Sequence, residues 1–341
     1  MKLFSAARGI LPGFVLSLLI ACAAVWIEGL LPIHLIGGSV IALFIGMFLN
    51  GRLHIPGLAK GVKFTSKKVL KFAIILLGAS LNVQTVLTVG RLSLSVMCFT
   101  LLTCFGGGYF IGKAFGLNWK LSNLISAGTG ICGGSAIAAI APVIDAEDRD
   151  IAYAMSATFL FDMAMIVLFP IMGRYMGLSD MAYGLWAGTA VNDTSSVVAA
   201  GYAFSEAAGD FATMVKLTRT LSIIPTVLIF ALINIRLKQK ASGSRETVGD
   251  KVRFTTLFPW FILFFVLLSL VNSVGLIPAA LSAHAKAISK FLMVAALAAI
   301  GLNTSYHEMK KAGIAPMLHG FVISLLVVIV AISVEWCMGI V

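Results

Sequence analysis

Long runs of hydrophobic residues, separated by short polar segments, make up most of this chain. A helix that crosses a membrane needs about 20 mostly apolar residues, and many of the runs approach that length without the alternation of a β-strand. We therefore predict eleven membrane-spanning segments, at residues 10–30, 35–50, 66–82, 92–114, 121–144, 150–173, 180–202, 211–235, 255–275, 284–303 and 316–340.

The composition indicates an all-α polytopic membrane protein. Of the 341 residues, 60% are hydrophobic and 11% are charged, whereas soluble domains have about 45–50% apolar and about 25% charged residues. This excludes soluble enzymes and disordered chains. Lipid satisfies no backbone hydrogen bond, and the runs are too long and too uniform for barrel strands, so the spans must be helical.

The positive charges predict an orientation. The formal net charge is +11, but Lys and Arg lie between apolar runs rather than among aromatic residues, so no nucleic-acid partner is expected. With a cytoplasmic N-terminus and a C-terminus on the opposite side, 19 of the 25 Lys and Arg residues are cytoplasmic, as the positive-inside rule requires. We expect one transmembrane domain over residues 1–341 with a cytoplasmic linker at about 236–254, and no cleaved leader, since the first apolar run continues past Cys22.

The fifth predicted span contains a cluster of glycines and hydroxyl residues. Each glycine inside a helix costs about 1 kcal/mol relative to alanine, so the cluster favours an unwound point at membrane depth. Close packing of two helices is the alternative. The candidate substrate-binding residues in this segment are Gly128, Thr129, Gly130, Cys132, Gly133, Gly134 and Ser135.

The seventh predicted span repeats this pattern sixty residues later. Its centre places an acid among polar neighbours, and the candidate ion-coupling residues are Asn192, Asp193, Thr194 and Ser195. A carboxylate at the bilayer centre costs about 2.5–3.5 kcal/mol, so Asp193 should face a cavity, a partner or a proton. The alternative is a protonated Asp193 that only locks two helices together. In the predicted topology both spans run in the same direction, so this sequence similarity alone does not indicate an inverted repeat.

Three further charged residues lie in apolar surroundings. Asp162 in the sixth span is either a coupled acid or a structural hydrogen-bond acceptor. Lys216 and Arg219 share a helix face; they either extend to the membrane surface or line a site that attracts an anion or neutralises the acids. Glu28 and Glu335 lie near span ends, where we expect them to be solvated. No histidine pair has metal-ligand spacing, so no metal is expected.

The two polar stretches, Gly128–Ala139 and Asn192–Gly201, together with Lys216–Arg219 and Pro225, resemble the YeiH-like bacterial inner-membrane proteins, which are commonly described as sulfate exporters. The similarity covers nearly the whole chain. This family is similar in outline to the grouping of cation/proton antiporters and anion transporters. The resemblance implies a transport core with inverted repeats and broken helices in a bacterial inner (cell) membrane. Some relatives have His-Glu in place of Asn192-Asp193, so it assigns no specific role to Asn192.

The first functional hypothesis is secondary active export of a small anion, sulfate or a related sulfur oxyanion, by alternating access coupled to H⁺ or Na⁺. The break in the fifth span would offer backbone N–H groups and a half-helix N-terminus near Ser135 to the anion. Lys216 and Arg219 would reinforce that site. Asp193, with Asp162, would bind the coupling ion.

Two alternatives remain: a passive anion channel, and an intramembrane aspartyl protease using Asp162 and Asp193. Such proteases place Gly-x-Gly before the second acid, whereas this chain has Ala190-Val191-Asn192. We therefore do not expect an enzyme, and we expect no cofactor. The expected partners are the anion, H⁺ or Na⁺ and the lipid bilayer, and a homodimer is compatible with the sequence.

Overall fold

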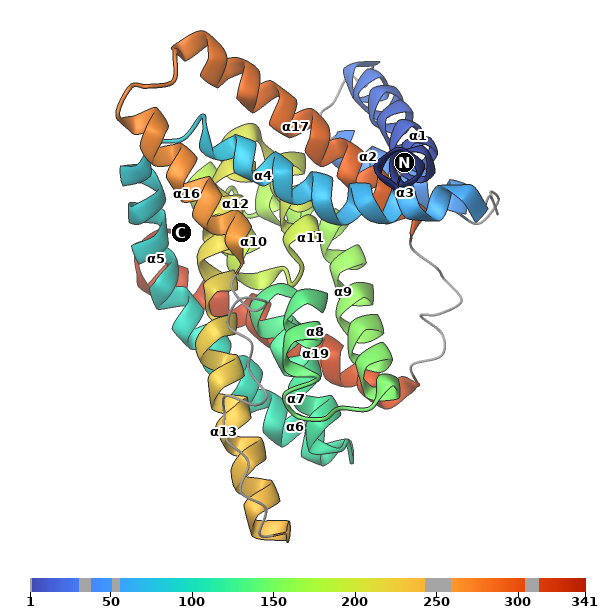
Figure 1. Ribbon diagram of the computed structural model, residues 1–341. Helices are drawn as coiled ribbons and strands as arrows, with labels where there is room; N and C mark the ends of the chain where they lie inside the picture. Colours follow the sequence, from blue (N-terminus) through green and yellow to red (C-terminus); the bar gives the residue numbers. More distant parts are fainter. Residues whose placement is uncertain (1, 31–37, 51–55, 243–258, 304–312) are drawn as a thin grey trace.

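The computed structural model describes residues 2–30, 38–50, 56–242, 259–303 and 313–341. Within these ranges every regular element is helical (Figure 1). In the same part of the chain, six helical segments are long and apolar enough to cross a membrane, and Gly38–Asn50 and Trp260–Ser273 are shorter apolar helices. The protein is therefore an all-α, multi-pass membrane protein, as predicted.

A first bundle occupies the upper part of Figure 1. In it, α17 contacts α1, α2 and α4. Two glycines allow α2 and α17 to approach closely. A Cβ at Gly46 would lie 2.3 Å from the Ala298 carbonyl, and one at Gly301 would lie 2.1 Å from the Leu43 carbonyl. The bundle consists of α1 (Lys2–Leu30), α2 (Gly38–Asn50), η1 (Pro56–Leu58), α3 (Ala59–Phe64), η2 (Thr65–Val69), α4 (Leu70–Gly78), α16 (Trp260–Ser273) and α17 (Ala279–Leu302).

A second bundle holds the polar segments that the sequence singles out. It meets the first where α2 and α17 contact α11 and where α16 contacts α5. It consists of α5 (Val83–Leu102), η3 (Thr103–Gly107), α6 (Gly108–Ala114), α7 (Trp119–Ala127), η4 (Gly128–Cys132), α8 (Gly134–Ile140), α9 (Asp148–Tyr175), α10 (Asp180–Ala190), α11 (Thr194–Phe204), α12 (Glu206–Leu221), α13 (Ile223–Ser242) and α19 (Ile314–Cys337).

The fifth predicted span is broken where expected, but the chain reverses there instead of continuing. At the base, Lys120 Nζ donates to the Asp145 carbonyl at 2.6 Å. Higher up, a Cβ on Gly128 would lie 2.8 Å from Ile137 Cδ1. The arm of α7 and η4 and the arm of α8 are therefore antiparallel. We call residues 119–145 hairpin one; its first arm begins and its second arm ends on the same side of the bundle.

The seventh predicted span is also a hairpin, formed by α10 and α11. The Tyr183 hydroxyl donates to the Ala200 carbonyl at 2.9 Å, and the Tyr183 ring stacks on Phe204 with centroids 3.9 Å apart. The Ser205 hydroxyl donates to Asp180 Oδ1 at 2.6 Å. The first residues of α10 thus lie beside the last residues of α11. We call residues 180–205 hairpin two.

The long helix α9 shows how the two hairpins are oriented. Its 28 residues rise about 42 Å at 1.5 Å per residue, which is more than a hydrocarbon core of about 30 Å. Near its start, Asp150 accepts from Asn118 Nδ2 at the base of hairpin one, 3.2 Å away. Near its end, Arg174 Nη2 donates to the Ala203 carbonyl of hairpin two at 3.0 Å. The hairpins therefore enter from opposite ends, with α7 and α8 below α10 and α11 in Figure 1.

This geometry corrects the predicted direction of the polar segments. Because each hairpin returns to its starting side, the first arms of the two hairpins approach the centre from opposite ends rather than in parallel. The same revision moves Arg149 to the cytoplasmic side of the predicted topology and Arg174 to the other side. The two changes cancel, so the division of 19 to 6 is unchanged, and the orientation of the termini stays a prediction.

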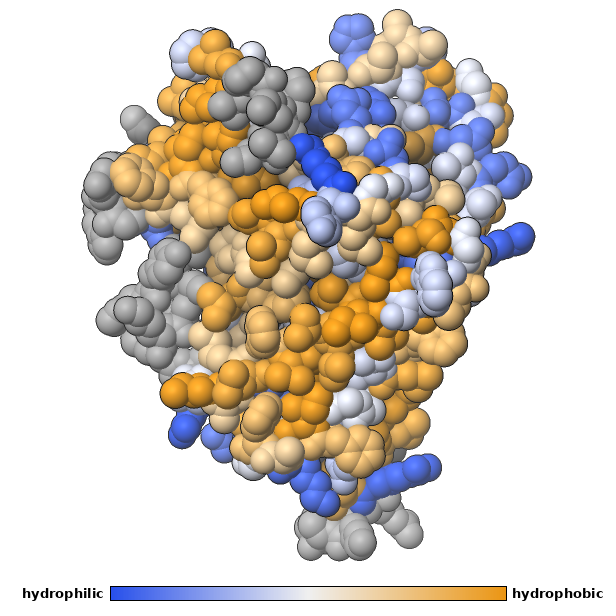
Figure 2. All heavy atoms as spheres, turned by 180° about the vertical axis from the view of Figure 1, so that it is seen from behind, coloured by the Kyte–Doolittle hydropathy of each residue, from blue (hydrophilic) through white to orange (hydrophobic). Residues whose placement is uncertain are grey.

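The surface agrees with a membrane environment. Figure 2 shows hydrophobic side chains over the middle of one face, with many hydrophilic ones at its upper right and lower end. Large exposed apolar side chains such as Phe99, Phe110 and Trp260 are suited to lipid contact. Of the predicted linker, residues 236–242 extend α13, and residues 243–254 lie outside the described residues.

Candidate functional site

The tip of hairpin one is a glycine turn. Gly133 has φ 64° and ψ −134°, a conformation that L-residues with a side chain rarely adopt. Its N–H donates to the Gly128 carbonyl at 2.8 Å and closes the π-helical turn η4. A Cβ at Gly133 would lie 2.9 Å from Asp193 Oδ1 and 3.2 Å from Asp193 Cα. The tips of the two hairpins therefore touch, and glycine is required at the contact.

The tip of hairpin two is a short extended segment with an acid at its end. Val191 and Asp193 both have extended backbone angles, with ψ of 136° and 147°. Asp193 is the N-cap of α11: its Oδ2 accepts from the Ser195 N–H at 2.9 Å and also from the Ser195 hydroxyl. A carboxylate is well suited to this position because the N-terminus of a helix carries partial positive charge.

Asp162, near the middle of α9, binds the backbone of the same tip. Its Oδ1 accepts from the Asn192 N–H at 2.9 Å, and its Oδ2 accepts from the Asp193 N–H at 3.0 Å. Only 1% of Asp162 is exposed. Asp162 thus satisfies two N–H groups that the break between α10 and α11 leaves free. A structural hydrogen-bond acceptor was one of the two roles predicted for this residue.

Arg219 and Lys216 bind the carbonyl ends of the first arms. Arg219 donates from Nε to Gly130 O at 2.7 Å, from Nη2 to Thr129 O at 2.6 Å and from Nη1 to Val191 O at 3.2 Å. Lys216 Nζ also donates to Val191 O, at 3.0 Å. Cations are stabilised at the C-terminal ends of helices. Both side chains are buried, so they do not extend to the membrane surface.

The polar face of the tips is partly accessible at mid-depth. Ser135 is exposed, and Gly134, Asp193 and Thr194 are half-buried. Cys132 lies buried behind them. Among the described residues, two buried oxygens near the tips, Thr129 Oγ1 and Asn192 Oδ1, have no hydrogen-bond partner. Unpaired buried polar atoms are costly, which makes this region a candidate ligand site.

Sequence reasoning missed two participants in the site and the burial of one acid elsewhere. The Val191 carbonyl lies in an apolar stretch and gives no signal. Ser324 Oγ accepts from Asn192 Nδ2 at 3.4 Å; a hydroxyl inside the last apolar run was the available signal. Glu335 was expected to be solvated, but it is fully buried, and neither carboxylate oxygen has a partner among the described residues. Glu335 lies on a buried face of α19 while the neighbouring Trp336 is exposed, so a position near the helix end does not place a side chain in solvent.

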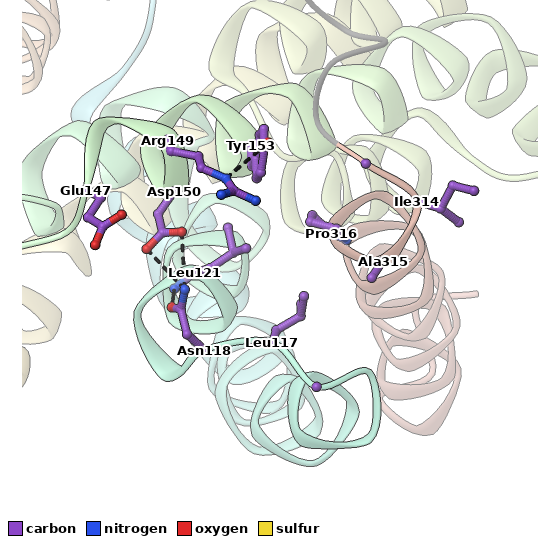
Figure 3. A pocket seen from close by; sticks show the side chains of 12 residues that line it. Leu117, Asn118, Leu121, Glu147, Arg149, Asp150, Tyr153, Ile314, Ala315 and Pro316 are labelled. Carbon is purple, nitrogen blue, oxygen red and sulfur yellow. Dashed lines mark hydrogen bonds between the residues drawn. The ribbon is translucent and has the colours of Figure 1, made fainter.

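A separate cavity of about 420 Å³ lies at the base of hairpin one (Figure 3). Its wall combines the α6–α7 turn, the start of α9 and the start of α19. In it, Asn118 contacts Asp150 and Arg149 Nε donates to the Tyr153 hydroxyl at 3.2 Å. No tip residue lines this cavity. In the described ranges, no three His, Cys, Asp or Glu side chains come together as a metal site.

Comparisons with known proteins identify the family. The family profile described as "Conserved hypothetical protein 698" matches residues 12–320. A UPF0324 membrane protein of Clostridium tetani is 56% identical over 334 residues, covering 96% of this chain and 97% of the relative. A UPF0324 membrane protein of Streptococcus agalactiae serotype V is 39% identical over 340 residues, covering 96% and 98%. One of Streptococcus mutans is 38% identical over 342 residues, covering 97% and 98%. The YeiH-like resemblance is confirmed, and the chain belongs to the UPF0324 membrane protein family.

Proposed function

We propose that this protein is a secondary transporter that moves a small anion, sulfate or a related sulfur oxyanion, by alternating access. The observation that carries the proposal is the meeting of two hairpin tips near the middle of α9, where Asp162 binds the backbone of hairpin two. Hairpins that enter from opposite sides place one polar site within reach of both sides of a membrane. Transporters commonly bind their substrates at such interruptions near the midplane.

The anion would bind on the accessible face of the tips. The N-terminus of α11 presents backbone N–H groups beside Thr194, and Ser135 adds a hydroxyl from hairpin one. Lys216 and Arg219 lie behind this face and hold both tips through carbonyl groups. Their charges favour an anion, while their hydrogen bonds keep the two tips together.

The arrangement around the tips also supports an inverted repeat. Hairpin one is followed by α9, which carries Asp162, and hairpin two is followed by α12 and α13, which carry Arg219. Beyond the tips, Asn234 Nδ2 of α13 donates to the Val143 carbonyl at the base of hairpin one, at 2.9 Å. The helix α9 therefore runs from the base of hairpin one to the base of hairpin two, and α12 with α13 runs back in the opposite direction. Alternating access requires two such opposed units around one site.

The alternatives are less well supported. A protease dyad needs two carboxyl groups that share a proton, whereas both oxygens of Asp162 accept backbone N–H groups. A passive channel would leave the paired charges at the tips without a role in coupling. Gradient-driven accumulation of the anion distinguishes a transporter from a channel.

The test is radiolabelled sulfate transport in proteoliposomes with an imposed pH or Na⁺ gradient. The proposal expects accumulation above the equilibrium level, inhibition by unlabelled sulfite, and loss of gradient-driven accumulation in Asp193→Asn. Flux no greater than in protein-free liposomes for sulfate and sulfite would overturn it. Flux that only equilibrates in the wild type would favour the channel. Cleavage of a helical reporter peptide, lost in Asp162→Asn and Asp193→Asn, would favour the protease.

A further inference from the structure

Asp193 occupies the position that the proposed function gives to the substrate anion. Its carboxylate caps α11 through the Ser195 N–H and hydroxyl, and its other oxygen faces Gly133. Unlike Asp162, which is 1% exposed, Asp193 is only half-buried. A substrate anion at the N-terminus of α11 would therefore lie beside a carboxylate that already holds one of the N–H groups there.

Two acids and two cations lie together at the tips. Asp162 on α9 is the acidic neighbour of Asp193, and Lys216 and Arg219 on α12 are the two cations. The thiol of Cys132 in η4 lies within electrostatic range of Asp193, and the Cys104 thiol in η3 within range of the two cations.

One further cation lies nearby, because Lys71 of α4 is within electrostatic range of Cys132. The neighbouring helix α2 contains no ionisable residue, and on α19 the contact with hairpin two at the tip is Ser324. The charged side chains of α17 lie elsewhere: Lys286 pairs with Asp210 at 2.6 Å, on the part of α12 beside the base of hairpin two. An anion at the N-terminus of α11 nevertheless lies beside the Asp193 carboxylate in partly desolvated surroundings, and the repulsion between the two negative charges is costly.

We propose that Asp193 takes up one proton each time the anion binds, so that proton and anion occupy the site together. The inference rests on the proposed function. Protonation removes the repulsion between carboxylate and substrate. The proton adds to one oxygen of the Asp193 carboxylate, and no other bond forms or breaks.

Co-binding sets the direction of coupling. A carrier that changes its accessibility only with both ligands bound moves proton and anion the same way, since each ligand stabilises the same state. An inward proton gradient then drives anion uptake. Export, which the resemblance implies, would require proton and anion to compete for the site, whereas a carboxylate beside the anion position makes the proton favour anion binding.

The test is calorimetric titration of the purified protein with sulfate in buffers of different ionisation enthalpy. We expect uptake of about one proton per sulfate, and a tenfold weaker Kd for each pH unit over the range in which Asp193 is ionised. Asp193→Asn keeps a good N-cap and mimics the protonated acid, so its Kd should not depend on pH and no proton should be taken up. Asp180→Asn, at the base of hairpin two, is the matched control and should behave like the wild type.

The outcomes separate this inference from the proposed function. Sulfate binding with no proton uptake, with proton release, or with uptake that persists in Asp193→Asn would overturn co-binding and leave the transporter proposal standing. If sulfate binds at no pH to the wild type or to Asp193→Asn, sulfate is not a ligand of the tip site and both proposals fall.

Discussion

Gly133 is the residue on which the contact between the hairpins depends most directly. Replacement by alanine forces a Cβ into a strained conformation and to within 2.9 Å of Asp193 Oδ1. Strain of this kind costs about 1–3 kcal/mol. We expect Gly133→Ala to lower the free energy of unfolding by about that amount and to displace Asp193, with loss of sulfate binding. Thermal unfolding in detergent and sulfate titration would check both effects.

The neighbouring glycine provides the control for this substitution. Gly134 is helical, and its Cβ would meet only the flexible end of Met155, at 3.1 Å. Gly134→Ala should therefore change the unfolding temperature little. Equal destabilisation by the two substitutions would show that the conformation of Gly133 has no special importance.

Arg219 tests the role of the buried cations at the same scale. Its guanidinium binds three carbonyl oxygens from two hairpins, and a lysine ammonium cannot match that planar geometry. Hydrogen bonds from charged groups contribute about 1.5–3 kcal/mol each. Arg219→Lys should thus destabilise the protein by about 3 kcal/mol or more, measured by thermal or denaturant unfolding. The same change at the exposed Arg236 should have almost no effect, and similar effects at both positions would argue against the arrangement.

At the scale of elements, the hairpins make a prediction that distinguishes them from straight spans. Lys120 and Asp145 lie together at the base of hairpin one, and Asp180 and Ser205 lie together at the base of hairpin two. In a background without native cysteines, Lys120→Cys and Asp145→Cys should react with a membrane-impermeant thiol reagent from the same side. Asp180→Cys and Ser205→Cys should both react from the other side. If Lys120→Cys and Asp145→Cys react from opposite sides, residues 121–144 cross the membrane as one span and hairpin one is wrong.

The hairpins also show what the sequence could and could not predict. Clustered glycines and an acid in apolar surroundings located both breaks correctly, because each departs from the composition of a membrane helix. The reversal at Gly133 was not predicted, since hydropathy sums apolar residues regardless of the direction of the chain. The contacts of Arg219 were equally invisible: Gly130 is 89 positions away, and only the fold brings the two together. Burial of Glu335 was missed because proximity to a helix end was taken as proximity to solvent.

The whole molecule consists of two bundles, and their contacts bear on the mechanism. All the tip residues belong to the second bundle, whereas α17 of the first bundle holds α12 through ion pairs at one end. Lys286 pairs with Asp210 at 2.6 Å, and Lys290 pairs with Glu206. Glu206 is largely exposed, and exposed ion pairs typically contribute about 0–1 kcal/mol. The Lys290–Glu206 pair can therefore form and break in the proposed transport cycle, and it marks a place where one bundle can move against the other.

Cross-linking the bundles tests whether that movement is required. Glu206→Cys and Lys290→Cys, joined by a short bifunctional thiol reagent with a reducible link, should fix α12 to α17. We expect sulfate transport in proteoliposomes to fall at least tenfold and to recover on reduction, because a locked pair of bundles cannot expose the tips to both sides in turn. The matched control joins Asp180→Cys to Ser205→Cys within hairpin two, where no movement between bundles is blocked, and transport should continue. Undiminished transport after complete cross-linking of Glu206→Cys to Lys290→Cys would mean that access alternates through the hairpins themselves.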